Sequence, residues 1–166
     1  MTYHAQKDSV RNLSMTTQKV ERVITHAKDR CMQSGARLTP KRETLLALLV
    51  TADKPLSPYE LVDQYNATTD ARMPANSAYR ILDFLVGIDL VHKLRSVNKY
   101  IACSHITCDH DHAIPQFLIC RECSRVNEIM VDEALIKALH NSVADAGYSL
   151  MNSHLEIDCL CDRCTK

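Results

Sequence analysis

Residues 120–123 read Cys-Arg-Glu-Cys, and residues 161–164 read Cys-Asp-Arg-Cys. Two such pairs, 37 residues apart, are typical of a structural zinc site in which four thiolates surround the ion and leave no position for water. A redox-active dithiol is the alternative, but it needs only one pair and usually opens a helix in a βαβ unit. We therefore predict a structural zinc ion held by Cys120, Cys123, Cys161 and Cys164. In a domain of about 60 residues, such a site supplies much of the folding free energy.

The residues around these pairs predict a small β-β-α-β unit. Strands are expected at Phe117–Ile119 and Val126–Val131, on either side of the first pair. Asp132 is expected to cap a helix over 133–145 that Gly147 ends, and a last strand over 148–157 runs into the second pair. The zinc ion would then join the two ends of the unit.

The N-terminal part of the chain predicts helices followed by a hairpin. Helices are predicted over 18–34, from 40, over 58–65 and over 76–86, because apolar residues recur there at helical spacing. A Pro directly after Thr39 and another directly after Ser57 mark two of the helix starts, and Glu60, three residues after Ser57, completes a capping box. In the last of these, the stripe Ala78, Ile81, Leu82 and Leu85 is expected to be buried. Residues 90–95 and 99–103 are then predicted to form two strands, joined into a hairpin by a turn at 96–98. This order is the pattern of a winged helix-turn-helix.

The predicted fold class is therefore α+β, with an N-terminal winged helix-turn-helix domain and a small C-terminal α/β domain that carries the four-cysteine zinc site. We expect a mobile tail at 1–17, the winged-helix domain at 18–103, a hinge or metal-binding loop at 104–115, and the zinc-binding domain at 116–166.

Composition and charge narrow the class of protein. The chain has 166 residues and no apolar run long enough to span a membrane, and its polar N-terminus lacks a secretory signal, so a cytoplasmic protein is expected. Eight cysteines then favour metal chemistry over disulfides. Residues 1–103 carry 15 Lys and Arg against 10 Asp and Glu, whereas residues 104–166 carry 5 against 10. The basic half suits a polyanion, and the acidic half suits cations.

Further metal-ligand side chains gather near the predicted domain junction. They are His92, Cys103, His105, Cys108, His110, His112, Glu128 and Cys159. A solvated His or a core Cys is the ordinary interpretation of any one of them, but their density favours a second metal site. A site that drew on both domains would make their relative orientation depend on the metal, as a sensor requires.

The predicted helix over 76–86 is the candidate DNA reader, with Arg80 as the best base donor, because an Arg side chain can bond guanine O6 and N7 together. Phosphate contacts are expected from Tyr59, Lys41, Arg42, Lys93 and Lys99. From the pattern alone, a protein-binding winged helix remains an equal alternative.

Several of these segments resemble those of a known family. The run Arg37-Leu38-Thr39-Pro40-Lys41-Arg42, the helix sequence from Ala78 to Leu85 and the two Cys pairs are similar to those of the ferric uptake regulator family. The stretches 91–93 and 98–103 are most similar to those of its zinc-responsive members. The resemblance covers about residues 20–164.

The resemblance implies a homodimeric, zinc-responsive transcriptional repressor that binds pseudo-palindromic operator DNA and silences zinc-acquisition genes. It implies that the small C-terminal α/β domain at 116–166 is the dimerisation domain. It implies a regulatory zinc site formed by His92, Cys103, His112 and Glu128, with His105 or His110 as alternatives to His112, and DNA contacts from Tyr59, Tyr79 and Arg80. About two Zn²⁺ ions per chain are therefore expected.

The expected donor set itself favours zinc. One thiolate, two imidazoles and one carboxylate suit tetrahedral zinc, and Cys103 in particular argues against the iron, manganese or peroxide-responsive members of the same family. An enzyme, such as a thiol oxidoreductase or a zinc hydrolase, is a less favoured alternative because its sequence motifs are absent. No role is predicted for Cys108 or Cys159.

Overall fold

The structure, a computed structural model, describes residues 3–107, 114–151 and 154–165, with side chains from residue 16 onward. The chain divides into two compact units, Met1–Cys108 and Asp109–Lys166. The division falls inside the segment 104–115 that the sequence predicts as a hinge, and each unit is described by itself below.

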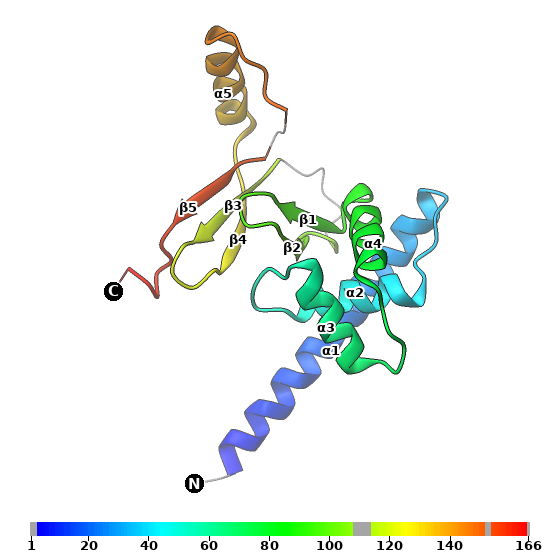
Figure 1. The fold of residues 1–166 in the computed structure, drawn as a ribbon. Coiled ribbons are helices and arrows are strands. Elements are labelled where there is room, and N and C mark those ends of the chain that lie inside the picture. Colours follow the sequence, from blue (N-terminus) through cyan, green and yellow to red (C-terminus); the bar gives the residue numbers. More distant parts are fainter. Residues whose placement is uncertain (1–2, 108–113, 152–153, 166) are drawn as a thin grey trace. The chain divides into compact units, whose positions relative to one another are not determined.

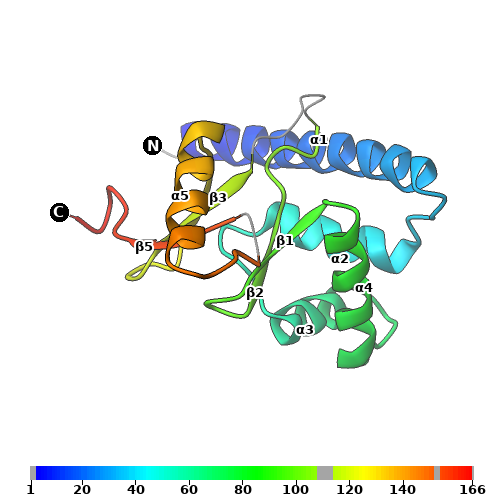
Figure 2. The same ribbon diagram turned by 90° about the horizontal axis from the view of Figure 1, so that it is seen from above.

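Four helices form the body of the first unit. They are α1 (Tyr3–Gln33), α2 (Pro40–Thr51), α3 (Pro58–Thr68) and α4 (Ala75–Gly87). Helix α2 contacts each of the other three helices (Figures 1 and 2). The stripe predicted on α4 lies in the core: Ala78, Leu82 and Leu85 are fully buried, and Ile81 is half-buried. This stripe therefore holds α4 against the other helices and leaves its opposite side exposed.

Helix α1 begins at Tyr3, well before the start predicted at Gln18. The segment predicted as a tail contains no Pro and no Gly, so nothing in its sequence interrupts the helical backbone. Figure 1 shows this N-terminal part of α1 extending beyond α2, α3 and α4. The prediction of the helix start was wrong because it relied on apolar periodicity, which only the part of a helix that packs on a core displays.

The predicted start signals mark the beginnings of α2 and α3. Thr39 is the N-cap residue of α2, although its side chain makes no capping hydrogen bond. The α3 N-cap, Ser57, forms a complete capping box with Glu60. The Glu60 backbone N–H donates to Ser57 Oγ at 3.2 Å, and the Ser57 backbone N–H donates to Glu60 Oε2 at 2.6 Å.

Two antiparallel strands complete the first unit as a wing. Strand β1 (Val91–Leu94) pairs with β2 (Lys99–Ala102), and Asn98 takes a positive φ of 49° in the turn between them. Asn tolerates this left-handed conformation better than most residues. Leu56, just before α3, extends the pairing: its N–H donates to the Tyr100 carbonyl at 3.0 Å, and the Tyr100 N–H donates back at 2.8 Å. The wing is thus tied to the start of α3 through the backbone.

The described residues of the second unit form a three-stranded sheet and one helix. The strand order is β4 (Val126–Met130), β3 (Pro115–Cys120) and β5 (Glu156–Cys159), with β3 antiparallel to β4 and parallel to β5. Helix α5 (Glu133–Asp145) lies in the connection between β4 and β5 (Figure 1). Asp132 caps α5 as predicted, since its side chain accepts from the Ala134 N–H at 2.7 Å.

Strand β5 is shorter than the segment 148–157 predicted as a strand. The Tyr148 N–H donates to the Val143 carbonyl and the Gly147 N–H donates to the Ala144 carbonyl, which is the Schellman arrangement that closes a helix. Gly147 supports it with a φ of 82°. Tyr148 therefore belongs to the end of α5, and pairing with β3 starts only at Glu156.

No helix among the described residues is long and apolar enough to cross a lipid bilayer.

Candidate metal centre and nucleic-acid interface

The four predicted zinc ligands of the second unit lie together. The sulfur atoms of Cys120, Cys123, Cys161 and Cys164 all lie within 4.8 Å of one another. The Cys123 and Cys161 sulfur atoms are 3.6 Å apart. Four sulfurs around a zinc ion, each bonded at about 2.3 Å, would be separated by about 3.8 Å. The cluster therefore fits a tetrahedral zinc ion in both donor type and spacing.

Two backbone turns bring these sulfurs together. After β3, the Ser124 N–H donates to the Cys120 carbonyl at 2.9 Å, and Ser124 has a positive φ of 59°. After β5, the N–H groups of Cys164 and Thr165 both donate to the Cys161 carbonyl. Because β3 and β5 are adjacent parallel strands that end at Cys120 and Cys159, the two turns emerge at the same edge of the sheet.

Side chains also join the two turns. Arg121 pairs with Asp158, and Arg125 Nη1 lies 3.6 Å from Asp162 Oδ1. The first pair is exposed and the second pair is exposed at Asp162 and half-buried at Arg125, so each adds little to stability. They nevertheless join the segment that carries Cys120 and Cys123 to the segment that carries Cys161 and Cys164.

The thiols of the cluster differ in acidity. Backbone N–H groups of Cys123 and Cys161 donate to the Cys120 sulfur and lower its pKa to about 6. Hydrogen bonding to Cys161, followed by burial, raises the pKa of the Cys164 thiol to about 12. Burial raises the pKa of Cys161, but its hydrogen bonds, chiefly from the Arg163 backbone, outweigh that effect and leave it lowered. The cluster thus already favours a thiolate, the form that binds a metal ion.

Cys159, for which the sequence predicted no role, pairs with Cys120 in the register of β3 and β5. Its carbonyl accepts from the Arg121 N–H at 3.0 Å. Cys159 therefore helps to align the first turn through its backbone, and its sulfur is not part of the four-thiol cluster.

The predicted regulatory ligands divide between the two units. His92 lies on β1 and Cys103 directly follows β2, where its N–H donates to the Leu90 carbonyl at 3.0 Å. This hairpin pairing brings a ring nitrogen of His92 within 4.8 Å of the Cys103 sulfur. Glu128 lies on β4 of the other unit and is half-buried. The first unit thus holds one imidazole and one thiol close enough to bind the same metal ion.

The remaining candidates around this pair are only partly described. His110, His112 and Cys108 lie outside the described residues. His105 is described: its backbone N–H donates to the Cys103 sulfur at 3.4 Å, and its Nδ1 lies 3.1 Å from Ser104 Oγ. The choice of third imidazole between His105, His110 and His112 therefore stays as the sequence left it.

The side chains predicted to contact DNA belong to α3 and α4 of the first unit. Tyr59, at the second position of α3, is 63% exposed, and Arg80 on α4 is also exposed. The rings of Tyr59 and Tyr79 meet edge to face with centroids 6.4 Å apart. The pKa of Tyr79 is raised by desolvation and by the neighbouring Tyr59. We refer to Tyr59, Tyr79 and Arg80 together as the Tyr-Arg group.

Three of the basic residues expected to contact phosphate have partners inside the unit, and one of them, Lys93, places its Nζ 5.7 Å from the centroid of the Tyr100 ring. The Arg42 guanidinium lies 3.3 Å from the centroid of the Phe84 ring, and Arg42 Nη1 donates to the Arg37 carbonyl. Lys99 on β2 pairs with Glu60 on α3. The sequence indicated the capping role of Glu60 but not this pairing, because the partner comes from a strand 39 positions further along the chain.

Comparison with known proteins agrees with this arrangement. Residues 33–158 match the Ferric uptake regulator family. The chain is 32% identical over 151 residues to the Zinc uptake regulation protein of Escherichia coli (strain K12), covering 91% of this chain and 84% of that protein.

Solved structures give a similar result. A zinc uptake regulator complexed with zinc and DNA matches with a TM-score of 0.76 and 30% identity, covering 88% of this chain and 95% of that one. The crystal structure of holo XcZur matches with a TM-score of 0.70 and 33% identity, covering 86% and 96%.

Proposed function

The chain belongs to the ferric uptake regulator family, and from this premise we propose that it is a zinc-responsive transcriptional repressor. It binds pseudo-palindromic operator DNA as a zinc-loaded homodimer in the cytoplasm and represses zinc-acquisition genes. The observation that carries the proposal is the match to a zinc uptake regulation protein over 91% of the chain. A winged helix that exposes Tyr59 and Arg80, together with a separate four-thiol cluster, is the arrangement that such a repressor needs.

Two zinc ions per chain are proposed, with different roles. Cys120, Cys123, Cys161 and Cys164 would hold the structural ion, and their four sulfurs leave no open coordination position. His92, Cys103, His112 and Glu128 would hold the regulatory ion. A thiol among these donors favours zinc over iron or manganese, which prefer imidazole and carboxylate ligands at higher coordination.

The regulatory site is proposed to couple the units because its ligands belong to both of them. His92 and Cys103 belong to the first unit, and His112 and Glu128 belong to the second. Zinc, when bound, would supply one positively charged centre for the nitrogen, sulfur and oxygen ligands of both units. The ligands then fix the orientation of each winged helix, and so the spacing of the two Tyr-Arg groups of a dimer on DNA.

This coupling has a required size and a reciprocal consequence. If zinc at the regulatory site tightens operator binding 100-fold, the coupling free energy is about 2.7 kcal/mol. Operator DNA must then tighten zinc binding at the same site by the same factor, because coupling between two binding equilibria is symmetric.

Metal titration against DNA binding tests the proposal. The protein is first used with zinc to select duplexes from a random pool, and the affinity for the selected duplex is then measured against buffered Zn²⁺, Fe²⁺ and Mn²⁺. The proposal predicts that Zn²⁺ activates binding at the lowest free concentration. Activation by Fe²⁺ or Mn²⁺ alone, or loss of binding on peroxide treatment without loss of zinc, would assign the chain to another branch of the family.

No catalytic role is proposed. The four-thiol cluster offers no coordination position to a substrate or a water molecule, which a hydrolytic zinc site requires. Zinc-dependent hydrolase or thiol oxidoreductase activity in the absence of DNA would contradict this part of the proposal.

A further inference from the structure

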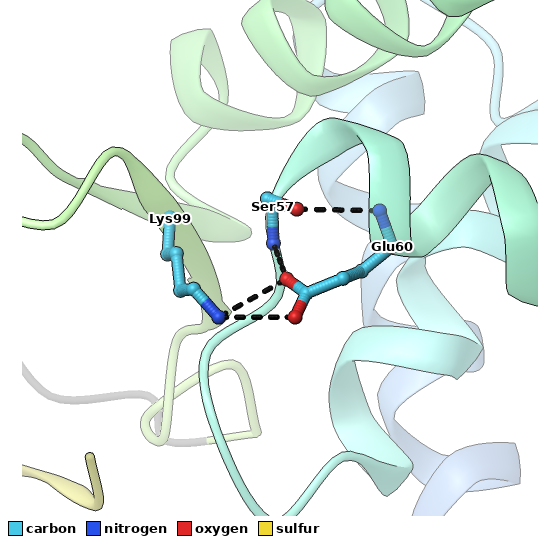
Figure 3. Close-up of polar contacts among 3 residues, drawn as sticks. All are labelled: Ser57, Glu60 and Lys99. Carbon is cyan, nitrogen blue, oxygen red and sulfur yellow. Dashed lines mark hydrogen bonds and ion pairs between the residues drawn. The ribbon is translucent and has the colours of Figure 1, made fainter.

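A charged pair joins the wing to the start of α3 (Figure 3). Lys99, the first residue of β2, places its Nζ 3.1 Å from both carboxylate oxygens of Glu60, the third residue of α3. The Lys99 side chain is 32% exposed and that of Glu60 is 46% exposed. The pair therefore lies at the surface of the unit, next to the exposed Tyr59.

The backbone fixes both ends of this pair. The capping box with Ser57 holds the Glu60 carboxylate at the first turn of α3, as Figure 3 shows. The two hydrogen bonds between Leu56 and Tyr100 hold β2 beside the same turn. An exposed ion pair is ordinarily weak because two long side chains must be ordered to form it. Here one partner is already ordered by a cap, so less side-chain freedom is lost.

The pair adjoins the surface that the proposed function assigns to DNA. Tyr59 separates Pro58 from Glu60 in sequence, and its ring contacts Tyr79 on α4. A lysine at this border would ordinarily bind a phosphate and release counterions from the duplex. A carboxylate that occupies the lysine lowers its attraction to phosphate, and it also repels the phosphate directly. The pair thus contributes almost no net charge where most DNA-binding proteins add positive charge.

We propose that Glu60 sets the general affinity of this protein for DNA: it withholds Lys99 from the phosphate backbone and so weakens binding to DNA of any sequence. This inference rests on the proposed function as a DNA-binding repressor. Phosphate contacts supply non-specific affinity, whereas base contacts such as those expected of Arg80 discriminate between sequences. Removing one phosphate contact per chain therefore lowers non-specific and specific affinity together, and it leaves base readout as a larger share of the whole.

Such a device matters because a genome offers a repressor a very large excess of non-specific sites. A dimer that held one more phosphate contact per chain would spend more of its time on those sites. In the Glu60–Lys99 pair, the lysine joins the wing to α3 and does not add a non-specific contact with DNA.

The test measures the salt dependence of DNA binding by four full-length, zinc-loaded proteins. They are the wild type, Glu60→Gln, Lys99→Gln, and the double variant Glu60→Gln/Lys99→Gln. Gln at the third helical position keeps the capping box, so α3 should still begin at Pro58. Each protein is titrated with a labelled duplex of mixed sequence and with the duplex selected by the wild type, between about 50 and 200 mM salt.

The expected result is specific to the pair. Glu60→Gln should steepen the slope of log K against log salt by about 0.9 per chain, because Lys99 then gains a phosphate. Lys99→Gln alone leaves the Glu60 carboxylate unpaired and should not steepen the slope, and the double variant, which lacks both charges, should return to the wild-type slope. The Glu60→Gln protein should also bind the mixed duplex more tightly than the wild type does.

Two results would overturn the inference. A shallower slope for the double variant than for the wild type would mean that Lys99 already contacts phosphate, and an unchanged slope for Glu60→Gln would mean that the carboxylate withholds nothing. The proposed function is judged separately, since wild-type protein that prefers the selected duplex to the mixed one supports it whatever the slopes of the variants. Failure of the proposed function would appear as no such preference, while the slopes on the mixed duplex still report on the pair.

Discussion

The sulfur atoms of Cys123 and Cys161 lie 3.6 Å apart although 38 positions separate these residues in the chain. The contact closes the second unit at one edge of its sheet, where the turns after β3 and β5 emerge. Few other described features close this unit, because α5 has a single buried residue, Ile136. We therefore expect the unit to depend on a metal ion held at this contact.

Replacing one thiol of the cluster should unfold the second unit. Cys120→Ser removes the most acidic thiol of the cluster, and zinc content should fall from about two ions per chain to about one or less. Circular dichroism and elemental analysis measure the loss. The matched control is Cys159→Ser, which lies beside Cys120 in the sheet but outside the cluster and should keep both ions. A stably folded Cys120→Ser protein with normal zinc content would refute the structural role.

Replacing the wing cysteine should have the opposite pattern of effects. Cys103→Ser should leave the fold and one zinc ion per chain intact, since the four-thiol cluster is unaffected. Operator binding should lose its zinc dependence, which we expect to be worth about 1–3 kcal/mol of coupling. Fluorescence anisotropy with and without zinc measures this loss. Unchanged zinc-dependent affinity would exclude Cys103 from the regulatory site.

Chelators should remove the two proposed ions in order. The mixed regulatory site should yield first to a weak chelator, with loss of operator binding and no loss of secondary structure. The four-thiolate ion should require a stronger chelator or acid, because its ligands must be protonated before it is released. Native mass spectrometry during the titration follows each ion, and simultaneous loss of both ions and of fold would contradict the assignment of separate roles.

Arg80 should contribute sequence discrimination, not general affinity. Arg80→Lys keeps the charge but cannot bond guanine O6 and N7 in the same paired geometry, so it should cost about 1–3 kcal/mol on the selected duplex and little on a mixed one. Competition assays with both duplexes make the comparison. Equal losses on the two duplexes would instead assign Arg80 to the phosphate backbone.

The stability added by Glu60 should depend on pH in a defined direction. Its pKa is lowered, first by the hydrogen bond from the Ser57 backbone and also by the Ser57 hydroxyl and Lys99, although burial opposes this. A lowered pKa in the folded state means that the contribution is complete above the unfolded value, near 4.5, and is lost as pH falls through the folded value. The stability difference between wild type and Glu60→Gln, about 0.5 kcal/mol for so exposed a pair, should therefore be constant above about pH 5.5 and shrink below pH 4.5. Chemical unfolding of the first unit across this range checks it, and a difference that grew on acidification would contradict the assigned cause.

Local signals in the sequence located most of the helices. Ser57-Pro58 with Glu60 predicted the start of α3, and Asp132 predicted the start of α5, because a cap is a contact within a few residues of itself. Where the signal was only periodicity, the prediction depended on packing. Periodicity predicts α1 only from Gln18, although the helix begins at Tyr3. It predicts a strand at Tyr148 because the closing motif of α5 is not a pattern of hydrophobicity.

By itself, the sequence determined the chemistry of this protein: four thiols in two pairs, an imidazole and a thiol on a predicted hairpin, and an arginine on the outer side of an amphipathic helix. Residue types and short spacings carry that information because ligand identity and helical periodicity are local properties. Only the tertiary structure decided which distant groups meet. The parallel pairing of β3 and β5 brings the two thiol turns to one edge, and the bridge between Leu56 and Tyr100 brings Lys99 to Glu60. Those contacts depend on strand order and register, which arise from the packing of the whole unit and leave no mark in any short stretch of the chain.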